Sequence, residues 1–163
     1  MKLTISLDHK LLDPYSRVSE RMLKKYEGEE LMETFIIPTK KFNQVSLGEA
    51  IEVIGSGGFC KVKQFINICL YPEADEISTQ DPFFTALAGV ILKFRLKVPL
   101  EIQVHGDFFC KVEGEYYYPK WRRILAKWTL SRADKIRVAG ERVGESLKDL
   151  GFKNIYIQSV KIC

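Results

Sequence analysis

Residues 76–107, EISTQDPFFTALAGVILKFRLKVPLEIQVHGD, contain the pattern on which the fold prediction depends. The first four residues read as a short strand, and Asp81 followed by Pro82 provides a helix N-cap with proline at the first helical position. Residues 83–94 predict a mostly apolar helix, and residues 100–104 a strand of the buried type. A strand, a helix and a strand in this order predict a parallel sheet with helices on its faces.

The same alternation extends over the rest of the chain. Strands are predicted at 3–7, 31–37, 50–54, 135–138 and 154–160, and helices at 16–26, 60–70, 119–131 and 141–150. The hydrophobic fraction of 46% is ample for a single core. We therefore expect one α/β domain over residues 1–163, with a Rossmann-like, three-layer architecture and a mostly parallel sheet.

Composition excludes several classes of protein. No apolar run reaches the length that a bilayer requires, because Lys93, Arg95 and Lys97 interrupt the best candidate, and the apolar opening is too short for a secretory signal. The four cysteines lack the paired spacing of a zinc or redox motif, and we expect Cys69 and Cys110 to lie in apolar surroundings. This pattern predicts that the cysteines are reduced thiols and that the protein is cytoplasmic.

Two predicted strand ends carry polar residues that fit a binding site. Residues 78–83 lead directly into a helix N-terminus, where free N–H groups favour an anion or a hydroxyl, although Asp81 also fits a plain capping role. His105 and Asp107 follow a buried strand, and ligands of open α/β sheets bind outside the carboxyl ends of strands. There Asp107 is placed to fix the tautomer of His105 or to orient an acceptor hydroxyl. A satisfied structural histidine is the alternative, and no third ligand for a metal is evident.

The positive charge of the chain lies in residues 119–137, which hold seven Lys/Arg and one Asp/Glu, while the other residues are slightly acidic. In the predicted helix one apolar face, which we expect to pack on the core, comprises Trp121, Ile124, Leu125 and Trp128. Lys120, Arg123 and Lys127 are expected on the opposite face, and with Arg122 they make up the basic residues of the helix. They form either ordinary solvated surface or a patch for anionic lipid headgroups or a phosphorylated acceptor. Nucleic acid is less favoured, because no recognised binding motif accompanies the helix.

Residues 76–143 combine these pieces in an order that resembles the N-terminal domain of family-4 glycosyltransferases, which have the GT-B fold. The resemblance rests on EISTQDPF (76–83), VPLEIQVHGD (98–107), RADKIRV (132–138) and ERV (141–143). It implies a domain that presents an acceptor to a nucleotide sugar held by a second, C-terminal domain. We expect that domain to be absent from this chain. The resemblance implies no metal, and no cofactor besides the nucleotide-sugar donor as co-substrate.

By position, the resemblance implies that His105 lies beside the reacting hydroxyl, that the acceptor cleft is lined by Gln80, Asp81 and Asp107, and that Glu141 lies near the interdomain cleft. Three positions depart from the family pattern. Residues 8–14, after the first strand, lack the Gly-Gly pair that many members place near the donor diphosphate, and glycine separates His105 from Asp107 and also precedes Glu141. The expected function is sugar transfer to an acceptor hydroxyl, with the isolated chain inactive. The expected partners are a donor-binding domain or subunit, a sugar or lipid-linked acceptor, and an anionic membrane surface contacted peripherally. The alternative is a non-catalytic α/β binding or scaffold domain, or a subunit of a separately encoded donor domain.

Overall fold

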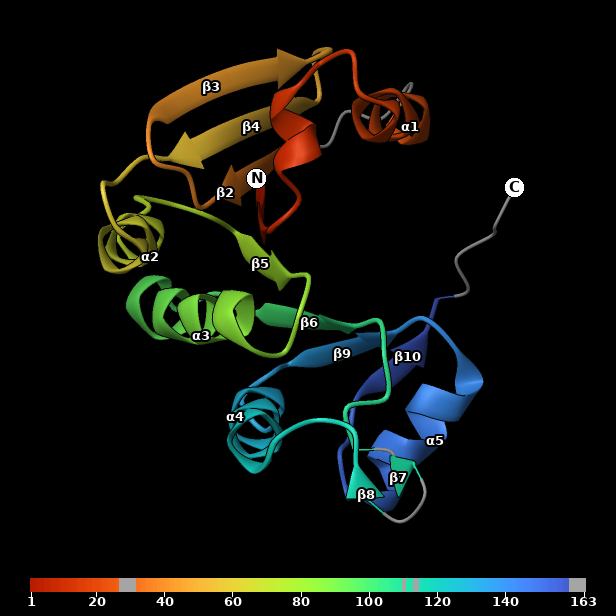
Figure 1. The fold of residues 1–163 in the computed structure, drawn as a ribbon. Helices are drawn as coiled ribbons and strands as arrows, with labels where there is room; N and C mark the ends of the chain where they lie inside the picture. Colours follow the sequence, from red (N-terminus) through yellow and green to blue (C-terminus); the bar gives the residue numbers. More distant parts are fainter. Residues whose placement is uncertain (27–31, 110, 113–114, 159–163) are drawn as a thin grey trace.

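The computed structural model describes residues 1–26, 32–109, 111–112 and 115–158. Strands and helices alternate along the chain (Figure 1). In order they are β1 (Lys2–Ile5), the short 3-10 helix η1 (His9–Leu12), α1 (Arg17–Lys25), β2 (Glu33–Ile37), β3 (Phe42–Leu47), β4 (Ile51–Ser56), α2 (Lys61–Cys69), β5 (Glu76–Thr79), α3 (Phe84–Leu96), β6 (Leu100–Val104), β7 (Lys111–Val112), β8 (Glu115–Tyr116), α4 (Lys120–Leu130), β9 (Lys135–Val138), α5 (Glu141–Asp149) and β10 (Ile155–Ile157).

Eight strands form one sheet in the order β10-β9-β6-β5-β1-β2-β4-β3. All neighbouring pairs are parallel except β3 and β4. The predicted α/β, Rossmann-like class is therefore confirmed. The sequence pattern does not predict β3, because Asn43, Gln44 and Ser46 make it a polar edge strand. Its pairing with β4, which sets Val45 opposite Val53, outweighs this weak local preference.

The path of the chain decides which face each helix covers. From β4 onward every helical connection between strands runs in one direction across the sheet, and a right-handed crossover then places α2, α3, α4 and α5 on one face. The connection from β1 to β2 runs the other way, which places α1 on the opposite face. Close packing agrees: a Cβ on Gly89 of α3 would lie 2.6 Å from Thr79 and 3.0 Å from Leu100. Glycine is therefore needed where α3 crosses β5 and β6.

Two apolar clusters fill the space between the sheet and its helices. The larger lies under α2–α5 and includes Leu3, Ile77 and Ile102, each 0% exposed. The smaller lies under η1 and α1 and includes Phe35 and Val53. Among the described helices, none is long and apolar enough to cross a membrane.

Candidate functional site

The sheet changes direction between β1 and β5, which are neighbours although their connections run to opposite sides. In open α/β sheets ligands bind in the crevice at such a switch point, outside the carboxyl ends of the strands. Ser6, directly after β1, donates a hydrogen bond of 2.6 Å from its hydroxyl to Oε1 of Gln80, directly after β5. Ser6 is 0% exposed and also accepts from the backbone N–H of Asp8 at 3.0 Å. The switch point is thus held together by side chains of both loops.

Asp81 lies beside this switch point, in the turn that precedes α3. Its Oδ1 accepts from the N–H of Phe83 at 2.7 Å, and its Oδ2 accepts from the hydroxyl of Thr85 at 2.8 Å. The predicted N-cap at Asp81, with Pro82 as the first helical residue, is therefore wrong: residues 81–83 form a turn, α3 begins at Phe84, and Phe83 at the N-cap position makes no side-chain capping bond. Both carboxylate oxygens are engaged with the helix start, so contact with a ligand would use their remaining lone pairs.

His105 is the first residue after β6 and is exposed at the same edge of the sheet as Gln80 and Asp81. Loss of solvent on the protein side and the positive charge of Arg137 lower the pKa of His105, while the negative charge of Asp81 opposes the shift. The imidazole is therefore predominantly neutral at pH 7, the form that accepts a proton.

Asp107 accepts hydrogen bonds from its own loop and from α5. Its Oδ1 accepts from the N–H of Phe109 at 3.1 Å and from the hydroxyl of Ser146 at 3.2 Å. With Arg142 and Glu145 of α5 it lines an open hollow of about 400 Å³. The structure thus places Asp107 in this hollow beside α5, whereas Gln80, Asp81 and His105 gather at the switch point.

Glu141 begins α5 at the carboxyl edge of β9, and its side chain is exposed. Gly140 before it is in extended backbone, with φ −163°. A carboxylate in the first turn of a helix is stabilised by the helix dipole, so Glu141 has a structural role whatever else it contacts.

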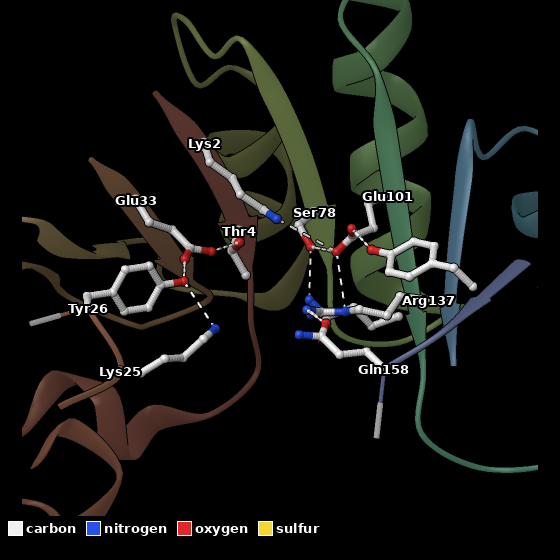
Figure 2. Close-up of polar contacts among 11 residues, drawn as sticks. Lys2, Thr4, Lys25, Tyr26, Glu33, Ser78, Glu101, Arg137 and Gln158 are labelled. Atoms are coloured by element: carbon white, nitrogen blue, oxygen red, sulfur yellow. Dashed lines mark hydrogen bonds and ion pairs between the residues drawn. The ribbon is translucent and has the colours of Figure 1, made fainter. Parts of the chain in front are cut away.

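A polar network covers the sheet face opposite α2–α5, and sequence reasoning missed it (Figure 2). At its centre Glu101 of β6, 5% exposed, accepts from the hydroxyl of Ser78 at 3.0 Å and from the hydroxyl of Tyr156. The Nε of Arg137 lies 3.4 Å and the Nζ of Lys2 lies 3.7 Å from Glu101 Oε1. The network therefore joins five strands: β1, β5, β6, β9 and β10.

The charges in this network determine its ionisation. Burial alone would raise the pKa of Glu101, but the hydrogen bond from Tyr156 and the charges of Lys2 and Arg137 outweigh burial and hold the pKa below its usual value. Burial and the nearby Glu101 carboxylate raise the pKa of Tyr156. Glu101 is thus ionised at neutral pH and Tyr156 is its neutral donor.

A second buried carboxylate lies nearby on the same face. Glu33 of β2 accepts from the hydroxyls of Thr4 and Tyr26 (Figure 2). Because paired residues of parallel strands point to the same side, the register of β1 with β2 and β5 sets Thr4 beside Ser78. Polar residues therefore alternate with apolar residues along several adjacent strands, which is the signal that could have revealed this face in the sequence.

The stripe of α4 that we expected to face the core is instead largely exposed. The exposed fractions are 60% for Trp121, 57% for Ile124 and 41% for Trp128, and Leu125 is half-buried. The predicted orientation of this helix is therefore wrong. The two tryptophans lie on the surface of the domain.

Smaller residues explain this orientation. Ala126, Thr129 and Leu130 are the buried residues of α4, and the hydroxyl of Thr129 donates to the backbone oxygen of Pro82 at 2.7 Å. Short side chains allow α4 to approach the start of α3 more closely than tryptophan would. The predicted basic face also divides: Arg123 is half-buried, and the exposed basic residues are Lys120, Arg122 and Lys127.

Asp134, in the RAD element of the resemblance, fixes the opposite edge of the sheet. Its Oδ2 accepts from the backbone N–H of Leu100 and lies 2.7 Å from Lys93 Nζ. It therefore ties the starts of β6 and β9 to α3, at the edge away from the candidate site. In the described structure Asp134 has a structural role.

Comparisons with known proteins show the fold. The UDP-GlcNAc 2-epimerase of Methanocaldococcus jannaschii aligns over 96% of this chain and 45% of its own, with a TM-score of 0.52 and 14% identity. A second UDP-N-acetylglucosamine 2-epimerase aligns over 96% of this chain and 47% of its own, with a TM-score of 0.56 and 13% identity. Neither a protein-family model nor a curated protein matches the sequence.

The class that the fold defines is α/β, with a mostly parallel sheet of the Rossmann type, and both epimerases share it over nearly the whole of this chain. The chain spans slightly less than half the length of either epimerase chain. At this low identity the likeness to the two epimerases establishes the architecture alone.

Proposed function

We propose that this chain is the acceptor-side domain of a GT-B glycosyltransferase, which transfers a sugar from a nucleotide-sugar donor to an acceptor hydroxyl. The observation that carries the proposal is the gathering of Gln80, Asp81 and His105 around the β1/β5 switch point. The resemblance over residues 76–143 and the nucleotide-sugar chemistry in the names of the structural neighbours support it.

The proposed roles follow from position and charge. His105 would take the proton from the acceptor hydroxyl, because its lowered pKa keeps the imidazole neutral and its side chain is exposed at the crevice. Gln80 and Asp81 would hydrogen-bond the acceptor, and Asp107 would reach it from the hollow beside α5. Glu141 would face the cleft between the two domains. The donor nucleotide would be held mainly by a separate domain or subunit.

A second candidate is a non-catalytic α/β binding domain or a subunit that pairs with a donor-binding protein. The observation that favours it is the structural engagement of two predicted site residues. Asp81 is hydrogen-bonded to the start of α3, and Asp107 to α5. Under this alternative, substitution of His105 would leave the turnover of the assembled enzyme unchanged.

Calorimetry of the isolated chain with a panel of nucleotide diphosphate sugars tests whether donor binding belongs to a separate domain or subunit. We expect no tight donor binding and no sugar transfer, because the donor half is proposed to lie elsewhere. Submicromolar donor affinity would contradict the proposal, and so would epimerisation of UDP-GlcNAc by the chain alone. In the enzyme assembled with its donor half, His105→Ala should lower kcat about 10²–10⁴-fold while leaving the unfolding temperature nearly unchanged.

We place this activity in the cytoplasm, on the pattern of the cysteines. Cys60 and Cys69 are free thiols, and burial raises the pKa of Cys69 to about 11. Cys69 therefore behaves as a small buried apolar residue, as predicted. Cys110, for which the same was predicted, lies outside the described residues.

A further inference from the structure

The outward face of α4 is apolar although no described element covers it. Trp121, Ile124 and Trp128 are 60%, 57% and 41% exposed and lie within two helical turns of one another. Exposed apolar patches rimmed by polar residues mark surfaces that contact another molecule. We call these three residues, with the basic residues around them, the α4 surface.

The charged residues of α4 are all basic. Lys120 and Lys127 are exposed on α4, and residues 119–133 contain no Asp or Glu. The Arg132 guanidinium lies 3.9 Å from the centre of the Trp128 ring, and that of Arg122 lies 5.2 Å from the Trp121 ring. The cations are therefore held beside the two indole rings rather than dispersed in solvent.

We propose that the α4 surface docks this domain on anionic membranes, with the two indole rings in the headgroup layer and the basic rim against lipid phosphates. Tryptophan favours the membrane–water interface because one end of its ring system is apolar and the N–H is polar. Lysine and arginine around an apolar stripe are the complement of an anionic lipid surface. The interior of a protein interface, by contrast, is depleted in lysine.

The position of α4 relates this surface to the candidate site. The helix begins at the carboxyl edge of the sheet, where Arg122 lies 5.6 Å from the ring of Phe83 at the start of α3. Farther along it, Lys127 lies 5.8 Å from the ring of Phe109, in the loop after β6. A lipid-linked acceptor held at the membrane would thus approach the edge that carries His105. This last step rests on the proposed function, whereas the docking itself does not.

Both tryptophans of the chain lie on α4, so intrinsic tryptophan fluorescence reports on this surface without background. On adding vesicles of phosphatidylcholine with phosphatidylglycerol at low salt, we expect the emission to shift to the blue and the protein to sediment with the vesicles. Vesicles of phosphatidylcholine alone should bind at least about tenfold more weakly, because the basic rim loses its partner. High salt should weaken binding without abolishing it, since the indole contacts are not screened.

Two double variants separate the contribution of the basic residues to vesicle binding from that of the tryptophans, and a third is the matched control. Lys120→Glu/Lys127→Glu should lower the vesicle affinity about tenfold or more, and Trp121→Ala/Trp128→Ala should remove the salt-resistant fraction measured by sedimentation. Lys40→Glu/Lys41→Glu changes an equal charge beside another exposed aromatic residue, Phe42, which is 68% exposed on β3. It should bind like the wild type.

Three results would overturn the proposal. Negligible vesicle binding by the wild type at low salt is the first, and an equal loss in the Lys40/Lys41 variant is the second. The third is a fluorescence shift with single-stranded oligonucleotides but not with anionic vesicles at the same salt, which would make the α4 surface a nucleic-acid site. All three leave the donor-binding calorimetry unaffected, so failure of docking and failure of the proposed function are distinguishable.

Discussion

The two faces of the central strands differ in what they bury. Under α2–α5, β6 presents Leu100 and Ile102, both 0% exposed. On the other face the same strand presents Glu101 and Gln103, which are buried but polar, and His105 follows them at its end. Strands of parallel sheets are usually apolar on both faces, so the polar face is the exception.

The two faces therefore have different roles in the domain. The apolar face supplies the burial that stabilises the fold. The polar face aligns neighbouring strands through hydrogen bonds that only the correct strand order satisfies, and its rows of polar side chains end at the switch point. A substitution on the apolar face should therefore affect stability. A substitution at the switch point, where the polar face ends, should affect binding or the proton affinity of His105.

The largest effect is expected on the apolar face. Ile102→Ala should lower the free energy of unfolding by about 2–5 kcal/mol, because it opens a cavity between β6 and the helices. Urea denaturation followed by circular dichroism measures the loss. Ile124→Ala, an equal truncation at the exposed face of α4, is the control and should cost less than about 0.5 kcal/mol. Equal losses in the two variants would show that the helical layer does not bury the sheet as described.

A smaller effect is expected in the polar network. Glu101→Gln should cost about 1–3 kcal/mol, since it removes the charge that Arg137 and Lys2 face. Because the pKa of Glu101 is lowered on folding, its stabilisation is present above the unfolded pKa and is lost as pH falls through the folded value.

The pH dependence of Glu101→Gln therefore provides an independent test. The variant should lose less stability than the wild type between neutral and acid pH. Glu49→Gln, at an exposed position, should retain the acid sensitivity of the wild type. A wild-type acid profile in Glu101→Gln would mean that this carboxylate does not stabilise the sheet.

A loss of about 1 kcal/mol is expected for Asp81→Ala, because the variant removes the hydrogen bonds from the Phe83 N–H and the Thr85 hydroxyl at the start of α3. Asp81→Asn should recover most of that stability, since the side-chain oxygen of asparagine can accept from the same N–H. If Asp81 also contacts the acceptor as a carboxylate, the asparagine variant should restore stability without restoring acceptor binding. Recovery of both would show that Asp81 acts only by holding the turn before α3.

The smallest effect concerns the proton affinity of His105. In an NMR titration its pKa should lie below the ordinary value; Arg137→Gln should raise the pKa, and Asp81→Asn should lower it further. Unchanged titration of His105 in both variants would show that it does not face these charges.

The sequence predicted the fold well because its signals were local. The apolar run of α3 and the β-rich residues of β6 each specify their element without reference to the rest of the chain, whereas the N-cap of α3 was placed too early, at Asp81 rather than at Phe83. The predicted final strand extended to residue 160, and its last two residues lie outside the described part. The edge strand β3 escaped prediction because pairing with β4, not its own pattern, makes it a strand.

The site was predicted less completely, since side-chain partners depend on register between strands. His105, Gln80 and Asp81 could be placed at one edge because parallel strands share it. The bond from Ser6 to Gln80 could not be predicted, because it joins residues 74 positions apart. The two tryptophans of α4 were assigned to the core because they are apolar, whereas packing selected smaller residues.

The most direct test of the account is a chemical-shift titration of the labelled chain with N-acetylglucosamine and, separately, UDP-GlcNAc. The central claim is that ligands meet this domain at the β1/β5 switch point. We expect weak binding, with the largest amide shifts at Leu7, Gln80 and His105 and negligible shifts in α2 and at the Asp134 edge. Shifts confined to the hollow beside α5, or the absence of any shift at the switch point with either ligand, would contradict it.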